Sequence, residues 1–429
     1  MHSAAEPFQQ IVDESLDEAT FLWRVWEREL TSPTRNLDEV WSWTEDRLHG
    51  ALDGVLVAGA GAIDVAAAGL LSNEPARVAA SAGVLASSAD QRATDALAAA
   101  LGAAEDEPLR AMVRGLELLG SDQALNAAAS VLTGRRSVDA GALCRLKAFH
   151  RVPPGDEMLT ALRSGIPDIQ VDALRAALLV PSRRAGEWIA AALRDRHAMV
   201  QYAAVEGAVS LGVDDGWETA VYLARKVDAD AGRYFKLLAM LGTPYEHAIV
   251  YSALRIPELQ LPAIWALGHI GTVRAAEACL AGMLYETLAR ACGEAYCWIT
   301  GADLARDDLA ADEPSVEVPP FEDDDLDANL VPPPEALWPL PDPDRARQHW
   351  LARSSQFVPD VRYIHGRPAT PETVSAMIET GPMLRRPDLV LELRARTQGR
   401  YDVETRAFRW RQRQMMARGR AALSTLDGR

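Results

Sequence analysis

Apolar residues recur at helical spacing through most of this chain, and in four places the pattern restarts directly behind a proline. These segments open at Pro75, Pro108, Pro167 and Pro257, so the intervals between them are 33, 59 and 90 residues. The intervals are close to one, two and three multiples of about 30 residues, and a fixed period of this kind is typical of repeat proteins. We therefore predict a repeating helical unit.

One unit is expected to contain two helices. Proline is well tolerated in the first turn of a helix, where its missing N–H leaves no hydrogen bond unmade. Asn73 and Asp106 come just before two of the prolines and are predicted to cap the helices, whereas Gly120 and Gly268 are predicted to end them. A second helix then follows, as over residues 124–132 or 188–193.

Further units without the proline fill the gaps. Their first helices are expected to start at Val138, at Arg196, near Ala231 and at Leu284, which brings the total to eight units. We predict an all-α fold, in which residues 51–302 form an α-solenoid of helix pairs of about 30 residues each. A solenoid presents an extended concave surface, so this architecture points to binding.

Residues 1–50 precede this array and are predicted to form an N-terminal helical cap. Trp23 and Trp26 lie near one face of a first helix, and a second helix starts after Ser32-Pro33. Two interpretations of the tryptophans are open: they close the end of the array, as terminal repeats must, or they form an exposed site for a partner. The second helix is expected to bury Leu37, Val40, Trp41, Leu48 and Leu52.

Charge divides the remaining residues into two segments. Residues 303–344 hold 14 acidic residues against one arginine and are rich in proline, which predicts an extended acidic linker. Phe321, Leu326 and Trp338 are expected to pin this linker locally. Residues 345–429 hold 17 arginines, no lysine and eight acidic residues, and are predicted to form a mostly helical, arginine-rich C-terminal module. Within it, VRYIHG is interpreted as one strand or an extended arm.

Residues with catalytic potential are scattered along the chain. Cys279, Cys292 and Cys297 lack the paired spacing of a zinc site and are expected to be packing thiols. His269 lies in an apolar helical pattern and is expected to be a core residue or a cation at a helix end. The run AGAGAID lacks the third glycine of a dinucleotide loop. We expect no catalytic residue, no metal and no cofactor, and hence a protein that is not an enzyme.

Arginines and aromatic residues interleave near the C-terminus, and a binding function is most visible there. The candidate partner-binding residues are Arg406, Arg409, Trp410, Arg411 and Arg413. Three interpretations are open: the segment docks on the acidic surface of its own chain, it binds another protein or peptide, or it contacts nucleic acid. The net charge of -17 repels phosphate backbones, so we expect no nucleic-acid partner.

The sequence also bears on location. The N-terminal residues lack the apolar stretch of a signal peptide, and no run of about 20 apolar residues occurs. Four cysteines are too few for a disulfide scaffold in a chain of 429 residues. We expect a cytoplasmic protein without membrane insertion, and we find no sequence signal for an oligomeric state.

Two segments resemble a known family. FLWRVWERELTSPTRNLDEVWSWTEDRLHGALDGVLVAG near the N-terminus and RYDVETRAFRWRQRQMMARG near the C-terminus are similar to a family of uncharacterised proteobacterial HEAT-like repeat proteins. Genes of that family often lie beside genes for type VI secretion. The resemblance covers most of the chain and implies a HEAT-like solenoid, but it carries over no catalytic residue.

The function that we expect is therefore a non-enzymatic scaffold or adaptor that binds other proteins, accessory to type VI secretion. Two alternatives stay open. One is an immunity protein or chaperone for a secreted toxin, which needs only a complementary surface. The other is an accessory of a lyase-type enzyme built on the same HEAT-like scaffold.

Overall fold

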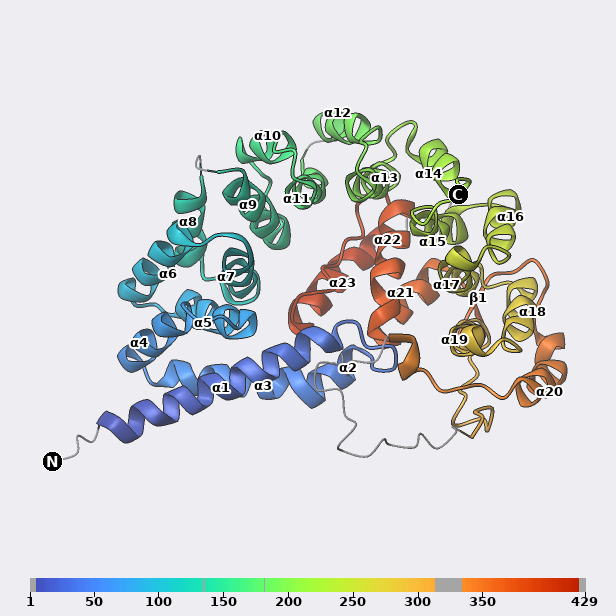
Figure 1. The fold of residues 1–429 in the computed structure, drawn as a ribbon, viewed down its shortest axis with the longest axis horizontal. Coiled ribbons are helices and arrows are strands. Elements are labelled where there is room, and N and C mark those ends of the chain that lie inside the picture. The colour runs from blue at the N-terminus through green and yellow to red at the C-terminus, as the bar shows by residue number, and fades with distance from the viewer. Residues whose placement is uncertain (1–4, 134–135, 181, 313–333, 424–429) are drawn as a thin grey trace, which may run out of the picture. The chain divides into compact units, whose positions relative to one another are not determined.

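The computed structural model describes residues 5–133, 136–180, 182–312 and 334–423. In these residues nearly all regular structure is helical, which confirms the predicted all-α class (Figure 1). By packing, the chain divides into two compact units, Met1–Trp217 with Glu379–Arg429, and Glu218–Ile378. This division cuts across the four segments predicted from sequence, because the C-terminal residues pack with the N-terminal ones.

Unit 1 combines helices from both ends of the chain. Its N-terminal part runs from a long first helix to α13, and its C-terminal part ends with α23. The elements are α1 (Ala5–Glu29), α2 (Leu37–Val40), the π-helical turn η1 (Trp41–Glu45), α3 (Asp46–Val57), α4 (Ala60–Gly69), α5 (Pro75–Ser87), α6 (Gln91–Ala103), α7 (Asp106–Leu119), α8 (Asp122–Leu132), α9 (Ser137–His150), α10 (Glu157–Leu162), α11 (Pro167–Ala177), α12 (Ser182–Ala192), α13 (Ala198–Leu211), η6 (Met383–Arg385), α22 (Arg386–Arg396) and α23 (Arg409–Leu423).

Alternate helices of unit 1 lie side by side. α5 packs against α7, α7 against α9, α9 against α11 and α11 against α13, while α6 packs against α8 in a second row (Figure 1). Gly115 of α7 allows the close approach of α5, because a Cβ at this position would clash with the carbonyl of Ala79. Each helix of the first row therefore buries one face against the helix two places further along the chain.

The predicted helix starts are accurate, and Gly120 ends α7 as predicted, but the two predicted N-terminal caps are wrong. Each of the eight expected first helices begins within three residues of its predicted position. The capping positions of α5 and α7 are Glu74 and Glu105, and neither side chain makes a capping hydrogen bond. Because the residue before a proline is extended, Glu74 takes the cap position itself and leaves Asn73 one residue too early. Asp106 is the first residue inside α7.

The N-terminal tryptophans are core residues. Trp23 and Trp26 on α1 are 2% and 0% exposed, which contradicts an exposed partner site at these two positions. The second helical run begins at Leu37, as predicted, but contains a π-helical turn over Trp41–Glu45. This turn leaves Trp41 partly exposed, contrary to the prediction, and buries the neighbouring carboxyl group of Glu45.

Unit 2 begins within α14 and ends within α21. It contains the later part of the array and the two short strands that the described residues form. The elements are α14 (Gly216–Ala224), α15 (Gly232–Leu241), α16 (Pro244–Ala253), η2 (Pro257–Leu259), α17 (Gln260–Ile270), α18 (Val273–Gly282), α19 (Glu286–Thr300), η4 (Pro334–Leu337), α20 (Pro343–Arg353), η5 (Ser354–Gln356), β1 (Tyr363–Ile364), β2 (Arg367–Pro368) and α21 (Pro371–Thr380).

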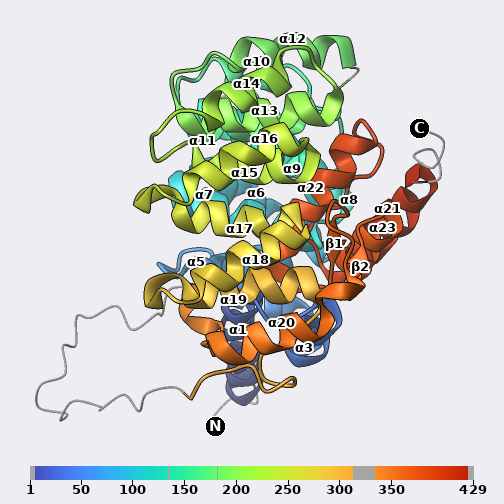
Figure 2. The same cartoon turned by 90° about the vertical axis from the view of Figure 1, so that its right-hand side faces the viewer.

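Alternate packing continues in unit 2. α15 packs against α17, and α17 packs against α19 (Figure 2). Pro257 opens a 3-10 turn, and the α-helix itself begins three residues later at Gln260. Gly268 lies inside α17 and does not end it; the helix ends at Gly271, which has a φ of 64°. His269 is fully buried in the last turn of this helix, in agreement with the predicted core position.

VRYIHG forms the first half of a tight hairpin. β1 pairs antiparallel with β2. The N–H of Tyr363 donates to the carbonyl of Gly271 at 2.8 Å, and the N–H of His365 donates to the carbonyl of Trp298 at 2.7 Å. Carbonyls in the last turn of a helix have no partner within the helix, so this hairpin satisfies the ends of α17 and α19.

One of the three residues expected to pin the acidic linker lies in the described part of the chain. Trp338 is 7% exposed, and its ring stacks on Trp265 of α17 with centroids 6.4 Å apart. Its carbonyl accepts a hydrogen bond from Arg290 of α19. Phe321 and Leu326 lie outside the described residues.

Candidate functional site

Residues 401–413, which we call the docking segment, lie on the N-terminal part of unit 1. Tyr401, Val403 and Phe408 are at most 2% exposed. The ring of Phe408 lies 5.0 Å from that of Trp26 and 4.4 Å from that of His49, measured between centroids. The preceding helix, α22, packs against α13 (Figure 1). The segment is therefore part of the core of unit 1.

Two of the predicted binding residues pair with one acidic residue of α2. Arg409 Nε donates to Asp38 Oδ1 at 2.6 Å, and Arg413 donates to both carboxylate oxygens of Asp38 at 2.9 Å. Arg409 also lies over the ring of Trp41 at 5.4 Å. These contacts are on the surface, since the Asp38 side chain is 52% exposed.

Arg411 lies among backbone carbonyls. Its guanidinium donates to the carbonyl of Phe149 at 3.1 Å and to that of Glu117 at 3.4 Å, and it packs over the Phe149 ring at 4.8 Å. It also donates to His150 Nδ1 at 3.3 Å, while His150 Nε2 contacts the carbonyl of Leu116 at 3.1 Å. This geometry requires a neutral His150, and burial, followed by the charge of Arg411, lowers the pKa of that imidazole.

The remaining two predicted residues have exposed side chains. The Arg406 guanidinium makes no hydrogen bond or ion pair with any described residue, although its backbone carbonyl accepts a bond from Arg114 at 2.7 Å. Trp410 is 55% exposed. Of the five predicted residues, Arg409, Arg411 and Arg413 contact the N-terminal part of unit 1 by their side chains.

A buried carboxyl group caps the helix that carries these arginines. Glu45 is 1% exposed; its Oε1 accepts from the backbone N–H of Arg409, the first residue of α23, at 2.7 Å. Its Oε2 accepts from Trp26 Nε1 at 2.9 Å. Burial raises the pKa of Glu45 to about 7, against the opposing effect of both hydrogen bonds.

Charged side chains form a buried network beneath the docking segment. Arg114 Nε lies 2.5 Å from Glu27, Arg114 also pairs with Glu117 at 2.9 Å, and Arg145 pairs with Glu117 at 2.7 Å. Burial by itself pulls up the pKa of Glu117, but Arg145 and Arg114 outweigh it, so the pKa ends below its usual value. The network holds the segment through the bond from Arg114 to the carbonyl of Arg406.

The docking segment also contributes an acidic residue, Asp402, to its contacts. Asp402 lies between Arg394 of α22, at 2.8 Å, and Arg151 just after α9, at 3.0 Å. Burial acts to raise the pKa of Asp402, but the two arginines outweigh it and hold that pKa below its usual value. The segment thus docks by contributing negative as well as positive charge.

Sequence reasoning did not find Glu45, Glu117 or Asp402. A signal existed for the first two, because each occupies a position on the inward face of an apolar helical pattern, where an unpaired polar group is costly. No such signal existed for Asp402, because it lies in a non-periodic stretch between α22 and α23.

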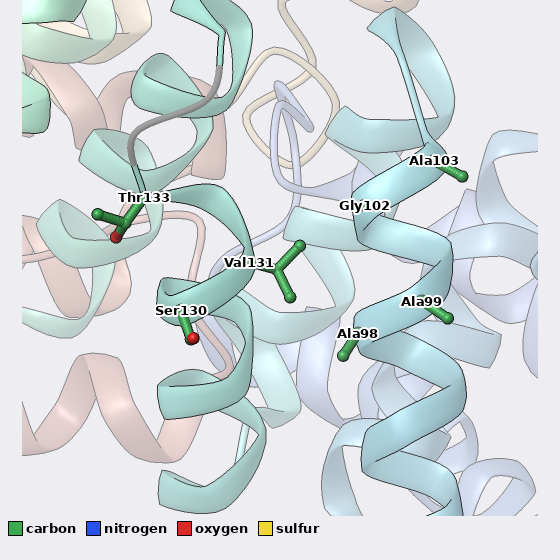
Figure 3. Close-up of a pocket in the computed structure, with 7 residues that line it drawn as sticks. All are labelled: Ala98, Ala99, Gly102, Ala103, Ser130, Val131 and Thr133. Atoms are coloured by element: carbon green, nitrogen blue, oxygen red, sulfur yellow. The ribbon is translucent and has the colours of Figure 1, made fainter.

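An open hollow of about 550 Å³ lies on the outer row of unit 1 between α6 and α8 (Figure 3). Its lining side chains are small and uncharged, and two of them carry hydroxyl groups. The lining residues are Ala98, Ala99, Gly102, Ala103, Ser130, Val131 and Thr133.

The cysteines and other candidate ligands lie apart. Among the described residues, no group of three His, Cys, Asp or Glu side chains is placed to hold a metal ion. Cys144, Cys279 and Cys292 are buried. Burial raises the pKa of the Cys292 thiol to about 12 and also raises that of Cys297, so both stay protonated.

No single helix in the described ranges is both long and apolar enough to cross a membrane. Leu37–Val57 and Ala60–Gly69 reach the required length and hydropathy as a pair, which is bent by 119°.

Comparisons with known proteins add little. No protein-family model matches the chain, and no curated protein matches it. Among solved structures, the crystal structure of an engineered protein from a structural genomics consortium is similar at 15% identity, with 90% of this chain and 98% of that chain covered. The TM-score is 0.29, a likeness too slight to carry an argument about fold or function.

Proposed function

We propose that this protein is a non-enzymatic, protein-binding scaffold whose helices form an α-solenoid of short HEAT-like repeats. The packing of α5, α7, α9 and α11 in unit 1, and of α15 and α17 in unit 2, each against the helix two places further along, supports the solenoid, because stacked helix pairs produce this pattern. On the family resemblance, we propose that the scaffold serves as an accessory of bacterial type VI secretion.

The observation that carries the proposal is the docking segment itself. The N-terminal part of unit 1 binds a basic and aromatic stretch of chain: Asp38 pairs with Arg409, the carboxyl group of Glu45 accepts from the backbone of Arg409, and Trp26 lies under Phe408. This combination of aromatic anchors and charged partners is typical of protein–protein interfaces. In unit 1 the inner surface that a partner was expected to use is thus occupied by the protein's own C-terminal segment.

We further propose that the segment stays docked while partners bind elsewhere on the scaffold. Phe408, Tyr401 and Val403 bury their side chains, so undocking must expose all three to water, at a cost of about 1.5–3 kcal/mol for a large apolar side chain. The exposed pairs at Asp38 contribute less than this.

The test combines cross-linking in the native host with capture of the full-length protein, both read by mass spectrometry. A scaffold retains at least one stoichiometric partner at physiological salt, with cross-links on outer helices and unchanged hydrogen exchange in residues 401–413. A partner that speeds exchange in this segment contradicts permanent docking. Capture of no stoichiometric partner contradicts the scaffold function.

A matched pair of variants controls the test. Arg409→Glu with Arg413→Glu repels Asp38, whereas Arg194→Glu with Arg196→Glu makes the same change of charge at exposed positions without a described partner. Equal partner binding by both variants is expected if the docked segment is not itself the partner site.

A further inference from the structure

Two cation–aromatic pairs lie on the surface of unit 2, where the end of α14 meets the start of α16. The guanidinium of Arg225 donates to the hydroxyl of Tyr245 at 2.8 Å and lies 5.3 Å from the centre of its ring. The ammonium group of Lys226 lies 5.1 Å from the ring centre of Tyr222. Figures 1 and 2 show α14 and α16 as neighbours. Because Arg225 and Lys226 are consecutive residues, the two pairs are treated together as one patch.

The apolar members of this patch face solvent. Tyr222 is 64% exposed and Tyr245 is 66% exposed, while the adjacent Val227 is 74% exposed. In the same unit, Tyr234 and Tyr296 are 2% and 0% exposed, whereas Tyr285 is 65% exposed. Tyrosine is enriched at protein interfaces because its ring buries a large area while its hydroxyl stays hydrogen-bonded.

The positive charges of the patch have no acidic partner. Among the described residues, neither Arg225 nor Lys226 forms an ion pair, in a chain whose net charge is -17. The nearby acidic side chains, Asp228, Asp230 and Glu246, already have partners. These partners are the backbone N–H of Ala231, the guanidinium of Arg233, and Thr243.

A purely local effect explains the positions of the two cations, but not those of the two tyrosines. Cations are favoured in the last turn of a helix, and Arg225 and Lys226 follow the end of α14. That effect does not explain why two tyrosine rings stay exposed beneath the cations, nor why Tyr245 from another helix holds the Arg225 guanidinium in place. A ready-made surface for an external ligand explains both.

We propose that Tyr222, Arg225, Lys226, Val227 and Tyr245 form a binding patch for an acidic segment of a partner protein, one that also carries an apolar side chain. Carboxylates of the partner would pair with the two cations, and its apolar side chain would cover the tyrosine rings and Val227. Charge complementarity selects this partner, since the patch is basic in a chain whose net charge is -17. The proposal does not depend on the docking segment or on type VI secretion.

The experiment measures fluorescence anisotropy of a labelled peptide, rich in glutamate with one phenylalanine and one leucine, against the full-length protein. The probe should bind, and a peptide with glutamine in place of glutamate should bind about tenfold more weakly. Arg225→Glu with Lys226→Glu should weaken binding of the probe by about tenfold or more. Tyr222→Ala with Tyr245→Ala, which keeps both charges, should weaken it by a similar factor.

Arg194→Glu with Arg196→Glu is the matched control, because it reverses two exposed arginines that form neither an ion pair nor an aromatic contact with any residue that the structure describes. Its affinity for the probe should stay within about twofold of wild type. Tyr245→Phe removes only the hydroxyl that holds Arg225 and keeps the ring, so a small loss confirms that this bond positions the guanidinium.

Several outcomes overturn the proposal. No binding of the glutamate probe does so, as does an equal loss in the control variant, which indicates attraction by charge alone. Tighter binding of a short single-stranded DNA, lost in the same patch variants, assigns the patch to nucleic acid and not to an acidic protein segment.

Discussion

The docking segment is held at two places that differ in kind. At its outer edge, Arg409 and Arg413 pair with Asp38, whose side chain is 52% exposed. At its inner edge, Phe408 is buried, and Arg411 donates to the backbone carbonyl of Glu117, whose 2%-exposed side chain belongs to the buried network with Arg114 and Arg145. Exposed ion pairs contribute less than about 1 kcal/mol each, whereas removing one member of a buried pair costs about 3–5 kcal/mol. The arginine-rich appearance of the sequence therefore marks the weaker contacts, and the stronger ones lie beneath them.

The buried network should give the largest effect. Glu117→Ala leaves Arg114 and Arg145 buried without their shared carboxylate, so we expect a loss of about 3–5 kcal/mol in the free energy of unfolding of unit 1. Urea unfolding combined with hydrogen exchange of unit 1 measures it. Glu105→Ala, which removes the exposed partner of Arg136, is the matched control and should change little. Equal losses in the two variants contradict the comparison.

Removing the buried aromatic anchor should have an effect of nearly the same size. Phe408→Ala creates a cavity beside Trp26 and His49, for which we expect a loss of about 3–5 kcal/mol. The readout is the rate of limited proteolysis between α22 and α23. Trp410→Ala, two residues away and 55% exposed, should leave the rate unchanged. Faster cleavage of the Trp410→Ala variant contradicts the inference that the buried side chain of Phe408, and not the exposed one of Trp410, keeps the segment docked.

The carboxyl group of Glu45 should make docking dependent on pH. Its pKa is about 7 in the folded protein, above the usual 4.5, so the folded state binds the extra proton. The stabilisation is fully present below about pH 4.5 and is lost as the pH rises through 7. Relative to Glu45→Gln, wild type should lose about 3 kcal/mol between the acidic and alkaline ends of this range.

Thermal unfolding of wild type and Glu45→Gln at a series of pH values tests this expectation. Burial lowers the pKa of His49, which also faces Phe408, and its contribution is lost in the opposite direction, as the pH falls. Both proteins contain this histidine, so the difference between their curves isolates Glu45. Parallel curves show that Glu45 does not titrate in this range.

The exposed pairs should give the smallest effect. Asp38→Asn removes the shared partner of Arg409 and Arg413, and we expect a loss of less than about 1 kcal/mol that shrinks further at high salt. Hydrogen exchange at the start of α23 measures it at low and high ionic strength. A loss of stability as large as that of Glu117→Ala, or one that does not depend on salt, contradicts the inference that the exposed pairs are the weaker contacts.

Much of the local structure was predictable. The starts of the array helices, the burial of Trp23 and Trp26 and the break ahead of Leu37 follow from apolar periodicity and from proline, which act within a few residues. Cap positions were less predictable because a shift of one residue changes which side chain reaches the free N–H groups, as Glu74 illustrates. Three of the five predicted binding residues contact the N-terminal part of unit 1 by their side chains.

The sequence by itself determined that this chain is helical, where its array helices begin, and that its arginines gather near the C-terminus. Tertiary structure alone decided what those arginines contact. Arg409 and Glu45 are 364 positions apart, and Arg413 and Asp38 are 375 apart. Helix periodicity is a local property, whereas these contacts depend on which faces of distant helices meet once the apolar surfaces are buried. For the same reason, only the tertiary structure shows how two buried carboxyl groups act on the docking segment. Glu45 accepts from the backbone of Arg409, and Glu117 pairs with Arg114, which donates to the carbonyl of Arg406.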